Sequence, residues 1–339
     1  MGGADPFTGI LCSEKLPDYE YLLNTADSAA SVLEHEDGGY RPADSDGNPG
    51  GLLDFTGGSR MLSVVVPDIH ARPSFLENLL AFRIPAGSDP CCGGQTVISA
   101  LEKKSLRVIC VGDIMHTERV TAERWRSAAA EFGRGEYSGP SMRAEMRESL
   151  SVLACVMELK IRFPSVFHIL KGNHENVMNR TGGGDFSFCK YADEGRMVRE
   201  FISSVYGDDV LYMISCWERF LPLSAVIPGC VISHAEPERT FSRRELVDAR
   251  LESDVVRGLT WTANGAAEEG SAAGTAAALL PGFTGSPFFI CGHRPVSGDF
   301  AVRQNGRVFQ IHNPDRQNVA LVRSDGEFCP ETDIVGVNV

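Results

Sequence analysis

The sequence predicts an α/β fold, and two observations carry this prediction. Five short apolar runs, largely β-branched, read as buried strands; they are residues 62–67, 106–111, 166–170, 230–232 and 288–291. Longer segments with helical spacing of apolar residues separate several of these runs. Each run is followed at once by polar residues. Because loops at the C-terminal ends of strands usually form the sites of α/β sheets, the same pattern predicts where the site lies.

The chain before the first run reads as an extension. Residues 1–8 (MGGADPFT) are typical of an expression-vector remnant, and residues 1–60 as a whole precede the main domain. We expect a short helix over residues 22–35. Residues 37–58 are dense in Gly, Asp, Ser and Pro, which favours loop or disorder. The main domain is predicted at residues 61–328, with a C-terminal tail at 329–339.

Within the main domain, Pro73 starts a helix that runs to residue 82. Two helical insertions are predicted, near residues 119–163 and 190–220. We expect the apolar residues of the second to roof the site; they are Phe201, Val205, Met213, Trp217 and Phe220. Residues 263–286 are rich in Ala and Gly and read as a mobile loop or a weak helix at 274–280. Alternating runs at 301–303, 307–312 and 318–323 predict antiparallel hairpins.

The polar blocks after the strands hold five of the eight histidines. The blocks are Asp68-Ile69-His70, Gly112-Asp113-Ile114-Met115-His116, Gly172-Asn173-His174-Glu175, Ser233-His234-Ala235 and Gly292-His293-Arg294-Pro295. Histidine, aspartate and asparagine at several strand ends indicate a metal site. The remaining histidines, His35, His168 and His312, read as structural or surface residues.

The donor set fits two divalent ions, which lie ~3.5–4 Å apart in such centres and share a bridging ligand. Mixed nitrogen and oxygen donors suit Mn, Fe or Zn better than Mg or Ca. We expect Asp68, His70 and Asp113 to hold one ion. The other is assigned to Asp113, Asn173, His234 and His293, with Asp113 as the bridge because a carboxylate has two oxygens to share. His174 should point toward substrate as a proton donor.

The order D-x-H, G-D, G-N-H-E, H-A, G-H resembles that of the calcineurin-like metallophosphoesterases, particularly the phosphoprotein phosphatase branch. Leu259-Thr260-Trp261-Thr262 is similar to the Leu-Trp-Ser stretch of that branch, and the resemblance spans residues 62 to about 325. It implies a four-layer αββα sandwich of two mixed sheets. It also implies hydrolysis of a phosphate ester, in which a metal-activated hydroxide attacks phosphorus and His174 protonates the leaving group.

The chain departs from the family pattern where phosphate is gripped. The family motif Gly-Asp-x-x-Asp-Arg-Gly has His116 at its second aspartate and Thr117 at its arginine. Residues 259–292 contain no Arg or Lys, although the family has a second phosphate arginine there. We expect Arg72, Arg180 or Arg294 to supply the positive charge, with Arg294 favoured because it follows a predicted ligand.

His116 itself has two possible roles. A neutral His116 can accept a hydrogen bond from His174, whereas a protonated one can donate to a phosphate oxygen. We favour the second role, because it accounts for both substitutions in the motif with one residue.

The composition of the chain argues against some classes of binding partner. The 339 residues are 43% hydrophobic, which is enough for a sizeable core, and the net charge is −13. This balance argues against a broad nucleic-acid surface or an anionic membrane surface. No apolar run approaches the ~20 residues of a membrane helix. Ten cysteines without zinc spacing, and no secretory signal, favour the cytoplasm.

Three functions follow from the sequence. The first is a dimetal phosphoesterase that acts on phosphoproteins or small phosphate esters. The second is a hydrolase of dinucleoside polyphosphates or other phosphoanhydrides, a group with similar motifs. The third is a metal-binding pseudo-phosphatase that has lost turnover together with its arginines and acts as a binding protein.

Overall fold

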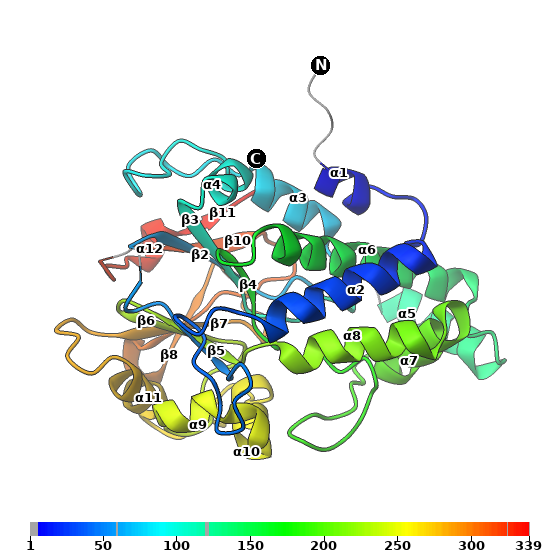
Figure 1. The fold of residues 1–339 in the computed structure, drawn as a ribbon. Coiled ribbons are helices and arrows are strands. Elements are labelled where there is room, and N and C mark those ends of the chain that lie inside the picture. The colour runs from blue at the N-terminus through cyan, green and yellow to red at the C-terminus, as the bar shows by residue number, and fades with distance from the viewer. Residues whose placement is uncertain (1–5, 59, 119–121, 324, 339) are drawn as a thin grey trace.

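The computed structural model describes residues 6–58, 60–118, 122–323 and 325–338. Residues 1–5 of the expected vector remnant and residues 119–121 at the start of the first insertion therefore lie outside the described part. Two mixed sheets face one another, and helices cover their outer faces (Figure 1). This is the four-layer α/β arrangement expected from the sequence.

The first sheet has five strands in the order β11-β10-β2-β3-β4. Its central strands β2, β3 and β4 are parallel, and β10 and β11 are antiparallel to their neighbours. The helices α1 to α8 cover its outer face (Figure 1). The strands are β2 (Leu62–Val66), β3 (Leu106–Cys110), β4 (Phe167–Ile169), β10 (Asn318–Val322) and β11 (Ile334–Gly336).

The second sheet has six strands in the order β1-β5-β6-β7-β9-β8. The pairs β1–β5, β6–β7 and β7–β9 are parallel, and β5–β6 and β8–β9 are antiparallel. The helices α9 to α11 pack on its outer face. The strands are β1 (Leu52–Asp54), β5 (Ser224–Ile227), β6 (Cys230–Ser233), β7 (Phe288–Cys291), β8 (Ala301–Arg303) and β9 (Val308–Gln310).

The predicted helices α2, α3, α5, α6, α7, α8 and α11 form close to where the sequence placed them, whereas α1, α4, α9, α10 and α12 were not predicted. The N-terminal ones are α1 (Pro6–Leu11), α2 (Tyr19–Glu34), α3 (Pro73–Ala81) and α4 (Val97–Glu102). The insertions are α5 (Ala122–Gly133), α6 (Pro140–Arg162), α7 (Glu194–Tyr206) and α8 (Asp208–Phe220). The remaining α-helices are α9 (Arg243–Val247), α10 (Ser253–Thr260), α11 (Ser271–Leu279) and α12 (Pro330–Asp333). Every helix in the described ranges is too short or too polar to cross a bilayer.

The structure corrects three expectations about these elements. Residues 37–58 are not all loop, because they contain β1, which pairs with β5 at the edge of the second sheet. The 307–312 and 318–323 runs do not form a hairpin, because β9 and β10 lie in different sheets. The apolar residues of α7 and α8 do not roof the site. Phe201 and Trp217 are buried in the helical layer, where α8 packs along α2.

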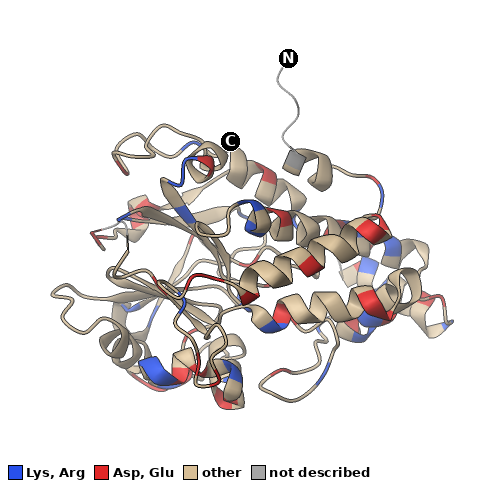
Figure 2. Ribbon diagram, viewed as in Figure 1, with Lys and Arg blue, Asp and Glu red and all other residues tan. Residues whose placement is uncertain are grey.

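Charged residues of both signs are interspersed along the outer helices (Figure 2). This mixture is consistent with the overall acidic balance of the chain.

Candidate metal centre

The five polar blocks meet between the two sheets. Asp68 and His70 follow β2, Asp113 follows β3, and Asn173 follows β4, all in the first sheet. His234 and His293 follow β6 and β7 of the second sheet. Since these strands are parallel within each sheet, their C-terminal ends lie at one edge, which brings the blocks together.

Asp113 lies at the centre of the predicted ligands. Its Oδ2 is 3.7 Å from Nε2 of His70 and 3.5 Å from Nε2 of His234. On the second side, Oδ1 of Asn173 lies 3.0 Å from Nε2 of His234 and 2.9 Å from Nδ1 of His293. Asp113 therefore lies between the two predicted sets of ligands, as a bridging carboxylate must.

Backbone carbonyls determine which histidine nitrogens face the carboxylates. Nδ1 of His70 lies 3.0 Å from the His116 carbonyl, and Nδ1 of His234 lies 3.1 Å from the Val111 carbonyl. A carbonyl can only accept, so Nδ1 carries the proton in both rings. Each Nε2 then presents a lone pair toward Asp113. Lone pairs facing a carboxylate repel it, and a cation between them removes the repulsion.

Burial shifts the pKa values of the carboxylates and histidines of the site in the directions that favour a bound cation. Burial raises the pKa of Asp68, and burial together with the charge of Asp68 raises the pKa of Asp113 well above its usual value. Burial also lowers the pKa of His70 and of His293 to about 3. The histidines are thus held neutral, which is the form that binds metal, while the carboxylates lack a counter-charge.

Two glycines leave room for the ligand carboxylates. A Cβ at Gly292 would lie 1.9 Å from Oδ1 of Asp68, and a Cβ at Gly172 would lie 2.2 Å from Oδ1 of Asp113. Glu175 completes this packing, because it accepts hydrogen bonds from the amides of Gly172, Asp113 and Ile114. The glycine and glutamate of the Gly-Asn-His-Glu block therefore hold Asp113 in place.

His174 and His116 form a pair beside this centre. Their Nδ1 atoms are 2.9 Å apart, so one ring donates to the other, and Nε2 of His174 lies 3.6 Å from Oδ2 of Asp113. Burial lowers the pKa of His116 to about 4, which leaves it neutral near pH 7. The expectation of a protonated His116 that donates to phosphate is therefore not supported. The neutral role, as hydrogen-bond partner of His174, fits the geometry.

The loop before α7 covers this pair. The ring of Phe188 packs 3.7 Å, centroid to centroid, from that of His174 and 5.2 Å from that of His116. Lys190, two residues further, is ion-paired with Glu118. This loop has no signal in the sequence, because nothing in residues 181–193 repeats the pattern of a strand followed by polar residues.

The three candidate arginines occupy different environments. Arg72 is buried, and its guanidinium donates to backbone carbonyls, including those of Asp68, Ile69 and Arg316. It is thus engaged in fixing loops rather than presented to a substrate, contrary to our expectation. Arg180 is exposed and lines a cavity with Lys171 and Glu218, on the α8 side. Arg294 is exposed beside His293, whose pKa its charge helps to lower.

Glu118 and His312 lie at the centre although neither was expected there. Nε2 of His312 is 2.9 Å from Oε2 of Glu118 and 3.7 Å from Oδ2 of Asp68. The reading of His312 as structural is corrected by this position. A signal was present in the sequence, because His312 follows an apolar run, as the other blocks do. The run was assigned only to antiparallel hairpins. The hairpin with β8 forms, but β9 also pairs in parallel with β7 and so ends at the same edge.

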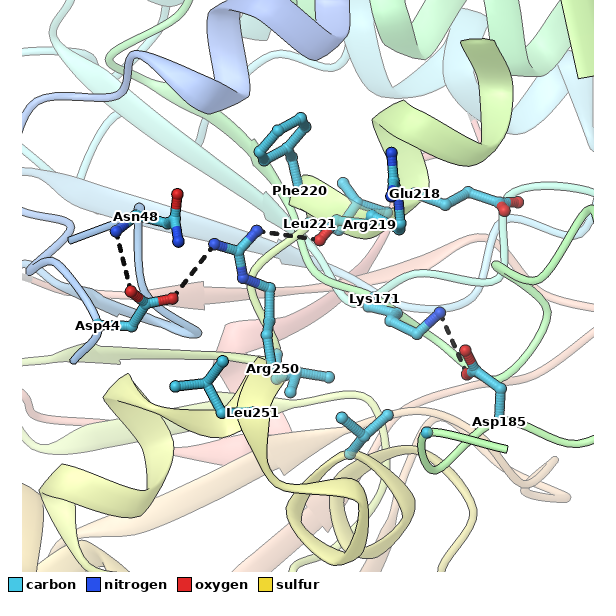
Figure 3. Close-up of a pocket in the computed structure, with 13 residues that line it drawn as sticks. Asp44, Asn48, Lys171, Asp185, Glu218, Arg219, Phe220, Leu221, Arg250 and Leu251 are labelled. Carbon is cyan, nitrogen blue, oxygen red and sulfur yellow. Dashed lines mark hydrogen bonds and ion pairs between the residues drawn. The ribbon is translucent and has the colours of Figure 1, made fainter. Parts of the chain in front are cut away.

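A separate cavity of about 390 Å³ lies between the N-terminal segment and α8 (Figure 3). Two of its cations, Lys171 and Arg250, are paired within its own wall. Nζ of Lys171 is 3.2 Å from Asp185, and Arg250 contacts Asp44 and the Arg219 carbonyl. The carboxyl of Glu218 also lies in this wall. Because Lys171 and Arg250 are already ion-paired, this cavity is a weaker candidate site than the histidine cluster.

Comparison with solved structures identifies the fold of the chain. No family model and no curated protein sequence matches the chain. Among solved structures, the chain is similar to a protein serine/threonine phosphatase from Saccharomyces cerevisiae. The TM-score is 0.55 at 14% identity, over 91% of this chain and 83% of the yeast chain. A cold-active protein-tyrosine phosphatase from a Shewanella species aligns with a TM-score of 0.45 at 15% identity, over 82% of this chain and 81% of that one.

The chain therefore has the fold of a protein serine/threonine phosphatase, as the motifs predicted. Buried groups of His and Asp that can hold metal lie where that fold joins its two sheets.

Proposed function

We propose that the protein is a dimetal-dependent phosphoesterase that hydrolyses phosphate monoesters, in a phosphoprotein or a small molecule. The observation that carries this proposal is the set of histidine lone pairs aimed at Asp113. Two bound divalent ions, Mn or an Fe/Zn pair by donor type, would supply an activated hydroxide and neutralise phosphate charge. Ten free cysteines favour a reducing compartment such as the cytoplasm.

The residues of this chain would divide the remaining work. Asp68, His70 and Asp113 hold one ion, and Asp113, Asn173, His234 and His293 hold the other. Nδ1 of His116 faces Nδ1 of His174. As an imidazolium, His174 would donate a hydrogen bond from Nδ1–H to Nδ1 of His116 and would pass its Nε2 proton to the leaving group, ending as a neutral imidazole. Phe188 packs on the His174 ring and limits the access of water.

Lys190 is our candidate for the substrate cation. It contacts Glu118, and its charge acts on His70 and His293, so it lies within electrostatic reach of both predicted metal sites. A lysine ammonium binds phosphate as a point charge. Arg294 remains a second candidate because it is exposed beside His293. Lys190 lacks the bidentate fork of a guanidinium, whereas Arg294 has one, so these two residues would replace the two family arginines only in part.

One observation favours phosphoanhydrides as a second substrate class. The partner of His174 is a neutral imidazole instead of a carboxylate, so it does not stabilise a positive charge on His174. His174 should therefore be a weak source of protons. A phosphate leaving group needs little protonation, whereas an alkoxide from serine or threonine needs a full proton.

A substrate panel tests the proposal. Protein reloaded with Mn is assayed on p-nitrophenyl phosphate, a phosphoserine peptide and a diadenosine polyphosphate, with Asp113→Asn as the inactive control. Turnover of the first two identifies a monoesterase, and preference for the third identifies an anhydride hydrolase. Two bound ions without turnover of any substrate would replace the proposal with a metal-binding pseudo-phosphatase.

A further inference from the structure

Glu118 and His312 stand among the predicted ligands of the first ion. His312 is fully buried and follows β9 in the second sheet, whereas Glu118 follows the Asp113 block in the first. Oε2 of Glu118 is 2.9 Å from Nε2 of His312 and 3.5 Å from Nε2 of His70. The two residues thus close the side of the site that Asp68, His70 and Asp113 leave open.

The distances fit ligands of one ion. Atoms bound to a transition metal at 2.0–2.2 Å lie at most about 4.4 Å apart. His70 Nε2 lies 3.8 Å from Asp68, 3.7 Å from Asp113 and 3.5 Å from Glu118. His312 Nε2 lies 3.7 Å from Asp68 and 2.9 Å from Glu118. Each of these five separations is below the limit, and Asp68, His70 and His312 form a group that can hold an ion.

A structural ion pair between Glu118 and His312 explains less of this arrangement. Oδ2 of Asp68 is buried and has no hydrogen-bond partner among the described residues, although it points toward His312 and His70. Three carboxylates, those of Asp68, Asp113 and Glu118, surround the same two rings. Burying several like charges together is costly unless a cation lies among them.

We propose that Glu118 and His312 are ligands of the first ion, so that five side chains hold it: Asp68, His70, Asp113, Glu118 and His312. This inference rests on the proposed dimetal function. Five side chains nearly fill an octahedral ion, whereas the second ion has four in Asp113, Asn173, His234 and His293. The first ion is therefore the one that is held more tightly and exchanges more slowly.

Metal binding to the whole protein tests the assignment without any assay of activity. Wild type, His312→Gln and Glu118→Gln are stripped, dialysed against graded Mn, and analysed for bound ions. His35→Gln is the matched control, because His35 is an exposed histidine whose Nδ1 lies 2.8 Å from the Ser31 carbonyl of the preceding helix, far in sequence from the polar blocks. We expect two ions in wild type and control. Each ligand variant should lose affinity for one ion by more than the roughly 10–100-fold that outer-sphere changes cause.

A second variant protects the test against misfolding. His312→Cys keeps a ligand at the position but changes its donor atom to sulfur. Loaded with Co²⁺, it should gain a thiolate-to-cobalt charge-transfer band in the near ultraviolet that wild type and a His35→Cys control lack. The absence of this band, together with two unchanged ion affinities in Glu118→Gln, would overturn the inference. Fewer than two ions in wild type would instead defeat the dimetal proposal on which it rests.

Discussion

The molecule contains two buried clusters of charged and histidine side chains that behave in opposite ways. In the first, Glu36 contacts Lys160 and Arg41 at 2.5 Å each, and His168 at 3.4 Å. Burial acts to raise the pKa of Glu36, but Lys160, His168 and Arg41 together lower it well below its usual value. The Glu36 cluster is complete in itself and joins α2 to α6.

In the metal centre, burial is equally deep, but the pKa values of Asp68 and Asp113 are raised. The neighbouring rings are neutral and present lone pairs, so they supply no compensating charge. The difference separates structural from functional burial. A buried carboxylate that is paired with cations of the protein contributes to folding. A buried carboxylate without such cations needs a positive charge from a bound ligand.

The largest effect is expected from Asp113→Asn. This change should abolish measurable hydrolysis and remove at least one ion, because the bridge is lost. Without metal, the variant should be more stable than wild type, since the repulsion with Asp68 disappears. Saturating Mn should raise the melting temperature of wild type more than that of the variant. Thermal unfolding with and without metal measures both effects. Equal stabilisation of the two proteins by Mn would show that Asp113 is not a ligand.

His174→Asn should lower kcat by ~10²–10⁴-fold on substrates with poor leaving groups. Hydrolysis of p-nitrophenyl phosphate should fall less, because its leaving group hardly needs a proton. Both ions should remain bound, as measured by elemental analysis. Loss of an ion would instead make His174 a ligand, which its 3.6 Å distance from Asp113 permits.

Glu36→Gln should lower stability and leave metal binding and catalysis unchanged, the opposite of the changes in the metal centre. It leaves Lys160 and Arg41 buried without their carboxylate, which costs about 3–5 kcal/mol for a broken buried pair. Denaturant unfolding measures this loss. The bound metal and the ratio of kcat between substrates should not change in the protein that remains folded. A variant as stable as wild type would show that the Glu36 cluster is not a structural anchor.

His116→Asp sharpens the comparison within the metal centre by giving His174 a carboxylate partner. We expect faster turnover of a phosphoserine peptide relative to p-nitrophenyl phosphate, by up to roughly 10²-fold, the low end of an acid–base contribution. Steady-state kinetics on the two substrates gives the ratio. An unchanged ratio would mean that His116 does not act through His174.

The last effect is a pH dependence of stability at Glu218, which is buried and accepts a hydrogen bond from the Val177 amide. Burial raises the pKa of Glu218 to about 8, above its unfolded value of about 4.3. Between these values the folded state binds the extra proton, so this contribution to stability is present below pH 4.3 and lost as pH rises toward 8. The slope is at most about 1.4 kcal/mol per pH unit. Glu218→Gln should remove it, as measured by denaturant unfolding across this window.

The sequence was sufficient for the five strands that precede the polar blocks and for most of the centre. Buried strands leave unbroken apolar runs, and the residues after them meet because parallel strands end at one edge. The sequence was insufficient where the position of a residue depends on which strand its own strand pairs with. The run before His312 forms the expected hairpin with β8, but the sequence does not show that it also pairs in parallel with β7, and this second pairing brings His312 to Asp68.

The directions of long side chains also could not be predicted from the sequence. Arg72 is two residues from His70, yet its guanidinium turns to the carbonyls of Asp68 and Arg316. Lys190 lies far from every motif in sequence and reaches Glu118 only because its loop folds over His174. Distance along the chain does not encode either outcome.

The pairing of β1 with β5 has a consequence for how the chain can be divided. Leu52, Leu53 and Asp54 align with Ser224, Ala225 and Val226 along the outer edge of the six-stranded sheet. A fragment that begins at residue 61 would expose that edge, and unpaired strand edges are templates for pairing with another molecule. The segment before residue 61 thus shields the sheet from self-association, and its removal should produce aggregates rather than a smaller monomer.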